Sequence, residues 1–347
     1  MSQASAPARR RGRGLIWLVI LIVALPLLWV GYWFASREFV SSAIERATAS
    51  LAARGTTVAC SRQTSGGFPL GLHLDCSEAV FSDHDSGTTV TLPRFVATAP
   101  LLSPGHVSTV ITGPLTVESP ESGASLEAAW HDATIDFYMG LGGLNGATVR
   151  AAQLEVTPVQ GTERMGFTSL AAGHATMTAR PGGGKDYRLS FDASDIALVL
   201  RKKKKNIPPF STTGEFVAHD FGGILGTRPK HAVEEWLAAG GELQVDRFGI
   251  VTGETSAEAT GRLRVSGEGL VSGELNVRIV GLDQIPAIAA RLGLGSKDRL
   301  ARVVGMASII TRAVPGNPAA RDLPVAIRDG VAWVGPIPVG TIPPLRL

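Results

Sequence analysis

The chain of 347 residues has little aromatic content, little charge and almost no cysteine. Aromatic residues make up 6% of it, so any core must be mainly aliphatic. Charged residues make up 18%, which is low for a soluble cytosolic enzyme. The net charge of +3 arises from two local basic blocks, at residues 9–13 and 201–205, so the charge gives no indication of a nucleic-acid partner.

Catalytic and cofactor motifs are also missing from the sequence. There is no G-x-S-x-G nucleophile elbow, and neither glycine-rich segment, 140–146 or 182–185, continues as a phosphate-binding loop. The seven histidines lack the spacing of a zinc motif, and the group around His84 (residues 82–87) is equally well explained as a polar turn. We therefore predict no enzyme activity, no catalytic residues, no metal and no cofactor.

One long apolar run is present near the N-terminus. Residues 15–35 carry no charge, and about 20 such residues are enough to cross a bilayer as a helix. Aromatic residues stand at both ends of the run, and four arginines precede it. The positive-inside rule then places residues 1–14 in the cytoplasm and the residues that follow the run on the other side of the membrane. A cleaved signal peptide is the alternative, but the run lacks an A-x-A cleavage site.

The two cysteines, Cys60 and Cys76, follow the predicted anchor and would therefore lie in an oxidising compartment. A structural disulfide between them would close a loop worth about 3 kcal/mol in the chain-entropy model. A zinc site would need His73 to join them, and a redox pair is usually C-x-x-C. We favour the disulfide.

Residues 36–55 show helical spacing of apolar residues and predict a stalk helix that ends at Gly55. From residue 56 the apolar period changes to two, in short runs bounded by turn residues. The predicted fold is α+β and β-rich: a large twisted antiparallel sheet with a few packing helices. We divide it into two related halves, residues 56–230 and 231–347, of which the second contains the helices.

Three fragments of the sequence resemble a known family. They are "GGFPLGLHLDC" near residue 66, "EEWLAAGGELQVDRFGI" near residue 234, and "LPVAIRDGVAWVGPIPVGTIPPL" near the end. Together they resemble the bacterial envelope family known as domain of unknown function 2125. The sequence is also distantly similar to the AsmA-like group of membrane-anchored periplasmic β-proteins, which implies a link to lipid. The family resemblance implies topology and architecture and no particular chemistry.

Two further segments are structural or binding candidates. Gly66 and Gly67 are expected to turn the chain off the stalk helix, while Phe68 and Pro69 form an apolar corner before the first strand. The basic run is either a solvated hairpin tip or a binding site for anionic lipid headgroups. Its residues are Arg201, Lys202, Lys203, Lys204 and Lys205.

The predicted function is a module, anchored in the inner membrane, that binds lipid or another apolar envelope component. An aliphatic sheet face held close to a membrane would suit an acyl chain. The alternative is an envelope scaffold or assembly factor that recognises another envelope protein through a sheet edge.

Overall fold

A computed structural model describes residues 24–25, 27–34, 49, 52, 55–67, 70–84, 86–103, 105–120, 123–140, 143–161, 167–201, 205–206, 208–221, 229–284, 305 and 311–344. Within these residues 19 strands form a single sheet. The strands are β1 (Thr56–Gly66), β2 (Gly71–Asp83), β3 (Thr89–Pro100), β4 (His106–Thr112), β5 (Leu115–Ser119), β6 (Ala124–Ala129), β7 (Asp132–Gly140), β8 (Gly143–Gln160), β9 (Phe167–Gly183), β10 (Asp186–Leu200), β11 (Lys205–Asn206), β12 (Phe210–Ala218), β13 (Glu242–Thr252), β14 (Thr255–Val265), β15 (Val271–Val280), β16 (Arg312–Val314), β17 (Asn317–Arg328), β18 (Val331–Val334) and β19 (Ile337–Thr341). Helix α2 (Pro229–Ala238) and the 3-10 turn η3 (Leu282–Gln284) complete the regular elements.

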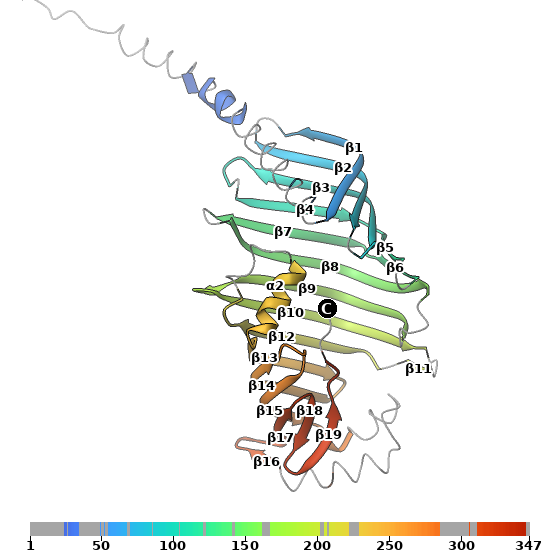
Figure 1. Ribbon diagram of the computed structural model, residues 1–347, viewed down its shortest axis with the longest axis vertical. Helices are drawn as coiled ribbons and strands as arrows, with labels where there is room; N and C mark the ends of the chain where they lie inside the picture. Colours follow the sequence, from blue (N-terminus) through green and yellow to red (C-terminus); the bar gives the residue numbers. More distant parts are fainter. Residues whose placement is uncertain are drawn as a thin grey trace, which may run out of the picture.

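The strands pair antiparallel and largely in chain order, from β1 at one edge to β19 at the other (Figure 1). Two positions in this ladder are each filled by two strands in line. Strands β4 and β5 lie end to end beside β3, and β7 and β6 lie end to end beside β8. The predicted antiparallel meander is therefore confirmed as one large sheet.

Two turns in the described part of the sheet carry sequence signals of a hairpin. Asp329 and Gly330 connect β17 to β18 with φ angles of 48° and 78°, as a two-residue turn with two positive φ angles requires. The repeated fragment "VSGE" flanks the turn between β14 and β15.

The start of the sheet differs from the prediction. The first strand is β1, so Gly66 ends β1, Gly67 lies in the connection to β2, and neither follows a stalk helix directly. Gly67 has a φ of 112°, and a Cβ there would lie 2.5 Å from the carbonyl oxygen of Gly71, so only glycine fits. Phe68 and Pro69 lie outside the described residues.

The N-terminal predictions fall mostly outside the described residues. Residues 24–25 and 27–34 of the predicted span are helical, as are residues 49 and 52 of the predicted stalk. In the part of the chain that the structure describes, no helix is both long enough and apolar enough to cross a membrane. Gly55 has a φ of 84° and immediately precedes β1, as expected of a residue that ends a helix.

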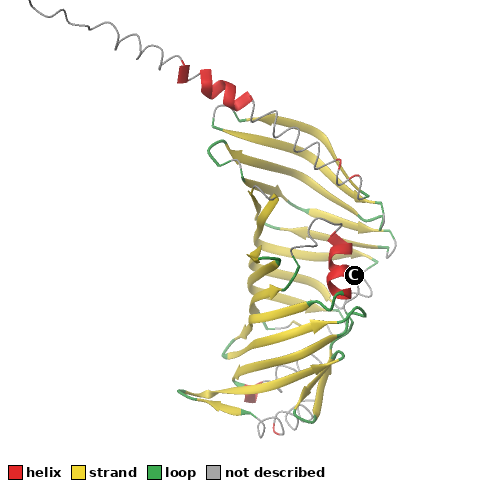
Figure 2. Ribbon diagram, turned by 60° about the vertical axis from the view of Figure 1, so that its left-hand side comes forward, coloured by secondary structure: helices red, strands yellow, loops and turns green. Residues whose placement is uncertain are grey.

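Helix α2 packs on one face of the C-terminal part of the sheet. Trp236 and Leu237 are 9% and 6% exposed and join a core with Val265, Val271 and Ile327 from β14, β15 and β17. Figure 2 shows the sheet in a curved profile, with α2 on its concave side.

The predicted boundary near residue 230 falls in the connection between β12 and β13. These two strands pair with each other, so the sheet continues without a break from one proposed half to the other. The sequence also predicts helices at residues 283–293 and 296–313, of which residues 285–304 and 306–310 are outside the described part. Arg312 and Ala313, expected at the end of the second helix, lie in β16.

Candidate functional site

Three neighbouring rows of side chains cross the face that α2 packs on, which we call the inner face. Because directly paired residues of adjacent strands point to the same side, the strand register assigns each row. From β4 to β13 the rows are Val107–Phe137–Ala147–Ala179–Leu189–Phe216–Val245, Thr109–Ile135–Val149–Met177–Phe191–Gly214–Phe248 and Ile111–Ala133–Ala151–Ala175–Ala193–Thr212–Ile250. None of these residues carries a titratable group.

The central part of the inner face is not fully covered by the described residues. Met177 is 55% exposed, Val149 is 40% exposed and Ile250 is 36% exposed. By contrast, Ile279 and Leu323 farther along the same face are 7% and 8% exposed, within a core that includes β18. An apolar surface that is contiguous and partly open is a feature of binding sites.

An aromatic cluster lies at the C-terminal end of this open region. Phe191, Phe216 and Phe248 come from β10, β12 and β13, and their ring centroids are 5.9–6.4 Å apart. Gly214 pairs with both Phe191 and Phe248. A Cβ at Gly214 would lie 2.4 Å from Phe191 Cε1 and 2.6 Å from Phe216 Cε2, so the absence of a side chain makes room for the rings.

The strands are bent along a line that we call the crease, which passes through Glu78, Gln153, Gly173 and Asp195. Glu78, Gln153 and Asp195 lie inside strands with φ angles of 51–53°, and Gly173 stands between Gln153 and Asp195 in the register. A left-handed residue inside a strand interrupts the pleat. The apolar positions shift by one residue there, so that both halves of each strand keep apolar side chains on the inner face.

Strand β8 shows this shift most clearly. Before Gln153 the inner positions are odd-numbered, as at Val149 and Ala151. After it the even-numbered Val156 lies in register, through Ala128, with Leu115, which packs against the same cluster as the inner residue Ile111. In β10 the change falls at Asp195, between Ala193 and the buried Ile196. Without the shift, half of each strand would turn its apolar side chains outward.

The disulfide between Cys60 and Cys76 joins the two sides of the crease. Cys60 pairs in register with Ala79, three residues beyond Cys76 on β2. Three residues of flat strand span about 10 Å, yet the Cα atoms of the cysteines are 5.6 Å apart. Both strands must therefore bend between these positions. Cys76 is fully buried in a cluster with Ala79 and Leu92.

The opposite, outer face is largely polar in the same strands. Asp136 is 7% exposed and accepts a hydrogen bond from Arg150, and its Oδ1 lies 3.1 Å from His106 Nε2. Burial raises the pKa of Asp136, but hydrogen bonds from Ser108, His106 and Arg150 outweigh it and leave the pKa below its usual value. The Asp136 group is therefore ionised and satisfied, and it has no feature of a reactive carboxylate.

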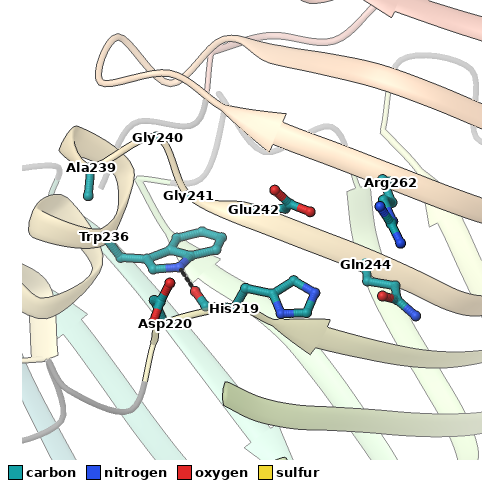
Figure 3. A pocket seen from close by; sticks show the side chains of 9 residues that line it. All are labelled: His219, Asp220, Trp236, Ala239, Gly240, Gly241, Glu242, Gln244 and Arg262. Carbon is teal, nitrogen blue, oxygen red and sulfur yellow. Dashed lines mark hydrogen bonds between the residues drawn. The ribbon is translucent and has the colours of Figure 1, made fainter. Parts of the chain in front are cut away.

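A polar pocket of about 530 Å³ lies where α2 meets the ends of β12 and β13 (Figure 3). Its lining residues are His219, Asp220, Trp236, Ala239, Gly240, Gly241, Glu242, Gln244 and Arg262. The Trp236 Nε1–H donates to the carbonyl oxygen of His219 at 2.7 Å. Among the described residues, the lining has no serine, threonine, cysteine or lysine that could serve as a nucleophile.

Asp186 holds the His219 side of this pocket in place. The backbone N–H of Asp220 donates to Asp186 Oδ1 at 3.1 Å, and His219 Nδ1 lies 3.0 Å from Asp186 Oδ2. The pKa of Asp186 is lowered, chiefly by the Asp220 N–H and less by His219. These groups satisfy one another, so they explain how the α2 end is attached and leave the inner face as the stronger candidate site.

The predicted basic site lies at the turn from β10 to β11. Arg201 is exposed there, Lys205 begins β11, and residues 202–204 lie outside the described part. The structure does not bring this turn near the helical residues 27–34, which contact the opposite strand ends, near β2 and β3. Headgroup binding by these residues stays a prediction. Among the described residues no group of three or more metal-ligating side chains is present.

The residues of the inner face and of the crease were not singled out from the sequence. A usable signal was present, because the apolar alternation changes parity inside "ATVRAAQLEVTPV" and "YRLSFDASDIALVL". A simple alternating strand would not change parity, so the change itself indicates a bend.

A family model described as an uncharacterized protein conserved in bacteria (DUF2125) matches residues 33–343. No curated protein and no solved structure matches the chain. The match includes the whole sheet and confirms the family resemblance of the sequence fragments. The more distant likeness to AsmA-like proteins stays a prediction.

Proposed function

We propose that the chain is a membrane-anchored module that binds lipid acyl chains. The grounds are its membership of the bacterial DUF2125 family and its exposed apolar inner face. The observation that carries this proposal is the centre of the inner face, where the described residues leave Val149, Met177 and Ile250 partly exposed. Residues 15–35 serve as the anchor and hold the sheet on the periplasmic side of the inner membrane.

The composition of the inner face favours an acyl chain over a protein surface. Protein interfaces form about one hydrogen bond per 100–200 Å², which requires polar groups on both sides. Between β4 and β13 the three inner rows contain only two hydroxyl groups, those of Thr109 and Thr212. The Thr212 hydroxyl already donates to the carbonyl oxygen of Gly249 at 2.9 Å. An acyl chain needs no such partner.

The inner face is also long enough for acyl chains. Nine strand positions lie from β2 to β13, and at about 4.8 Å between strands they extend over roughly 38 Å. The acyl chains of one leaflet span about half of the 30 Å hydrocarbon core of a bilayer. The inner face can therefore accommodate a whole acyl chain laid along it. With no titratable side chain in the three rows, the proposed role is binding without catalysis.

Photocrosslinking in cells tests this function on the full chain. A benzophenone amino acid replaces Met177 on the inner face or, as the matched control, its neighbour Thr176 on the outer face. After irradiation, the intact mass of the Met177 variant should increase by that of one lipid, and the mass of the control should not.

Two results would contradict the proposal. If the Met177 variant crosslinks to a discrete envelope protein in place of a lipid, the scaffold alternative is correct. If both variants acquire lipid equally, the label reports contact with the membrane and no specific site.

A further inference from the structure

The helical residues 27–34 are attached to the first strands of the sheet. The Trp33 Nε1–H donates to the carbonyl oxygen of Gly71 at 3.3 Å, and the Tyr32 hydroxyl donates to that of Leu101 at 3.3 Å. Trp33 is 8% exposed. Gly71 begins β2 and Leu101 follows β3, so the helix meets two connections at the same end of the strands.

These two connections each expose a large apolar side chain. Leu70 is 75% exposed and Leu102 is 85% exposed, whereas Leu101, the residue before Leu102, is 1% exposed. The backbone N–H of Leu101 donates to the carbonyl oxygen of Leu70 at 3.1 Å, so the two turns are neighbours. Near the end of β7 on this side, Met139 is 53% exposed. Adjacent exposed apolar tips are typical of a contact surface.

The two ends of the strands differ in charge. At the helix end, the three connections nearest the helix, at residues 67–70, 101–105 and 141–142, contain no Asp, Glu, Lys or Arg, whereas the next one, at residues 184–185, contains Lys185. At the far end, each of the connections between β2 and β3, β5 and β6, β8 and β9, and β10 and β11 contains at least one of these residues. Figure 1 shows the helix leaving from the side of the uncharged connections, opposite β11.

We propose that the turns carrying Leu70 and Leu102 insert into the interfacial region of the phospholipid bilayer that residues 15–35 cross. This inference rests on the membrane attachment proposed above. Tryptophan and tyrosine favour the bilayer interface, and Tyr32 and Trp33 are hydrogen-bonded to these same turns. The turns therefore lie at the depth at which the helix leaves the membrane.

This placement joins the bilayer directly to the inner face. Leu72 and Leu74 of β2 follow the exposed Leu70 within four residues, and they pair with Ala99 and Ala97 of β3. An acyl chain that leaves the outer leaflet beside Leu70 would meet these apolar pairs first. It would then continue along the rows toward β13 without crossing water.

Depth measurement with a fluorescent label tests the insertion. The full chain is reconstituted in phosphatidylethanolamine–phosphatidylglycerol vesicles, with Leu102→Cys carrying the environment-sensitive dye NBD. The native cysteines are paired and do not react. The matched control is His84→Cys in the charged turn after β2, where His84 is also exposed. NBD at position 102 should emit at shorter wavelength and be quenched at least twofold by lipid spin-labelled near the headgroup, and NBD at position 84 should not.

Equal emission and equal quenching at the two positions would overturn the inference. That result would not affect the lipid-binding function, because the crosslink at Met177 is read independently. Conversely, insertion at Leu102 without a lipid crosslink at Met177 would retain the membrane contact and contradict the lipid site.

Discussion

Replacing Gly214 with alanine should destabilise the protein, because the aromatic cluster leaves no room for one methyl group. The new Cβ would lie 2.4 Å and 2.8 Å from two atoms of the Phe191 ring and 2.6 Å from Phe216 Cε2. Favourable carbon–carbon contacts begin at about 3.5 Å, so the rings must move by roughly 1 Å. Gly214 has no positive φ angle, so the effect is steric.

The expected magnitude combines two opposing contributions. Overpacking of a filled core costs about 1–3 kcal/mol. Alanine also restricts the unfolded chain, which stabilises the protein by about 0.4–1 kcal/mol. The free energy of unfolding should therefore fall by about 1–2 kcal/mol. With a urea dependence of about 1–3 kcal/mol per molar, the midpoint of urea unfolding, followed by circular dichroism, should fall by roughly 0.5–1 M.

A double-mutant cycle shows whether the cause is the ring contact. Phe191→Leu removes two of the three closest atoms, so Gly214→Ala should cost less in that background than in the native chain. Coupling of about 1 kcal/mol is expected for residues in contact. The reasoning is refuted if Gly214→Ala leaves the urea midpoint unchanged, or if the two substitutions are additive.

Two further predictions concern the disulfide and the outer face. Replacing Cys60 and Cys76 with serine removes a loop closure worth about 3 kcal/mol for a separation of 16 residues. Amide hydrogen exchange should then accelerate in β1, because among the described strands β1 pairs only with β2. Equal acceleration in β9 would contradict this local effect. Asp136→Asn should lower the free energy of unfolding at pH 7 by about 1.5–3 kcal/mol. Because the pKa of Asp136 is lower in the folded state, its contribution is present above the unfolded value near 3.8 and is lost as the pH falls through the folded value. The difference between Asp136→Asn and the native chain in urea titrations should therefore shrink below pH 4, and a difference that stays constant down to pH 2 would count against the ion pair.

Most of the strand order could be predicted from the period-two pattern, because each of these strands alternates and ends at turn residues. Strand β1 was missed for a physical reason. It is an edge strand with five consecutive exposed positions, residues 61–65, so its sequence "SRQTS" carries no apolar alternation. Only the pairing with β2 reveals it.

The candidate site could be predicted in kind but not in position. The scarcity of aromatics and the Val, Leu and Ala alternation indicated an aliphatic face, but alternation alone does not distinguish a filled core from an open surface. That distinction depends on what covers the face, and α2 contacts only its C-terminal part. The disulfide was predictable, because only two cysteines are present and both follow the predicted anchor.

The crease has a consequence for how such chains can vary. Each bent strand contains one residue more than a flat strand with the same apolar side chains would need. Deleting Gln153 from β8, or Asp195 from β10, would restore an unbroken alternation and leave the apolar residues on the same side. Because β8, β9 and β10 pair across the crease without a register shift, relatives of this chain could flatten the sheet through matching single-residue deletions in neighbouring strands, while keeping the same apolar lining.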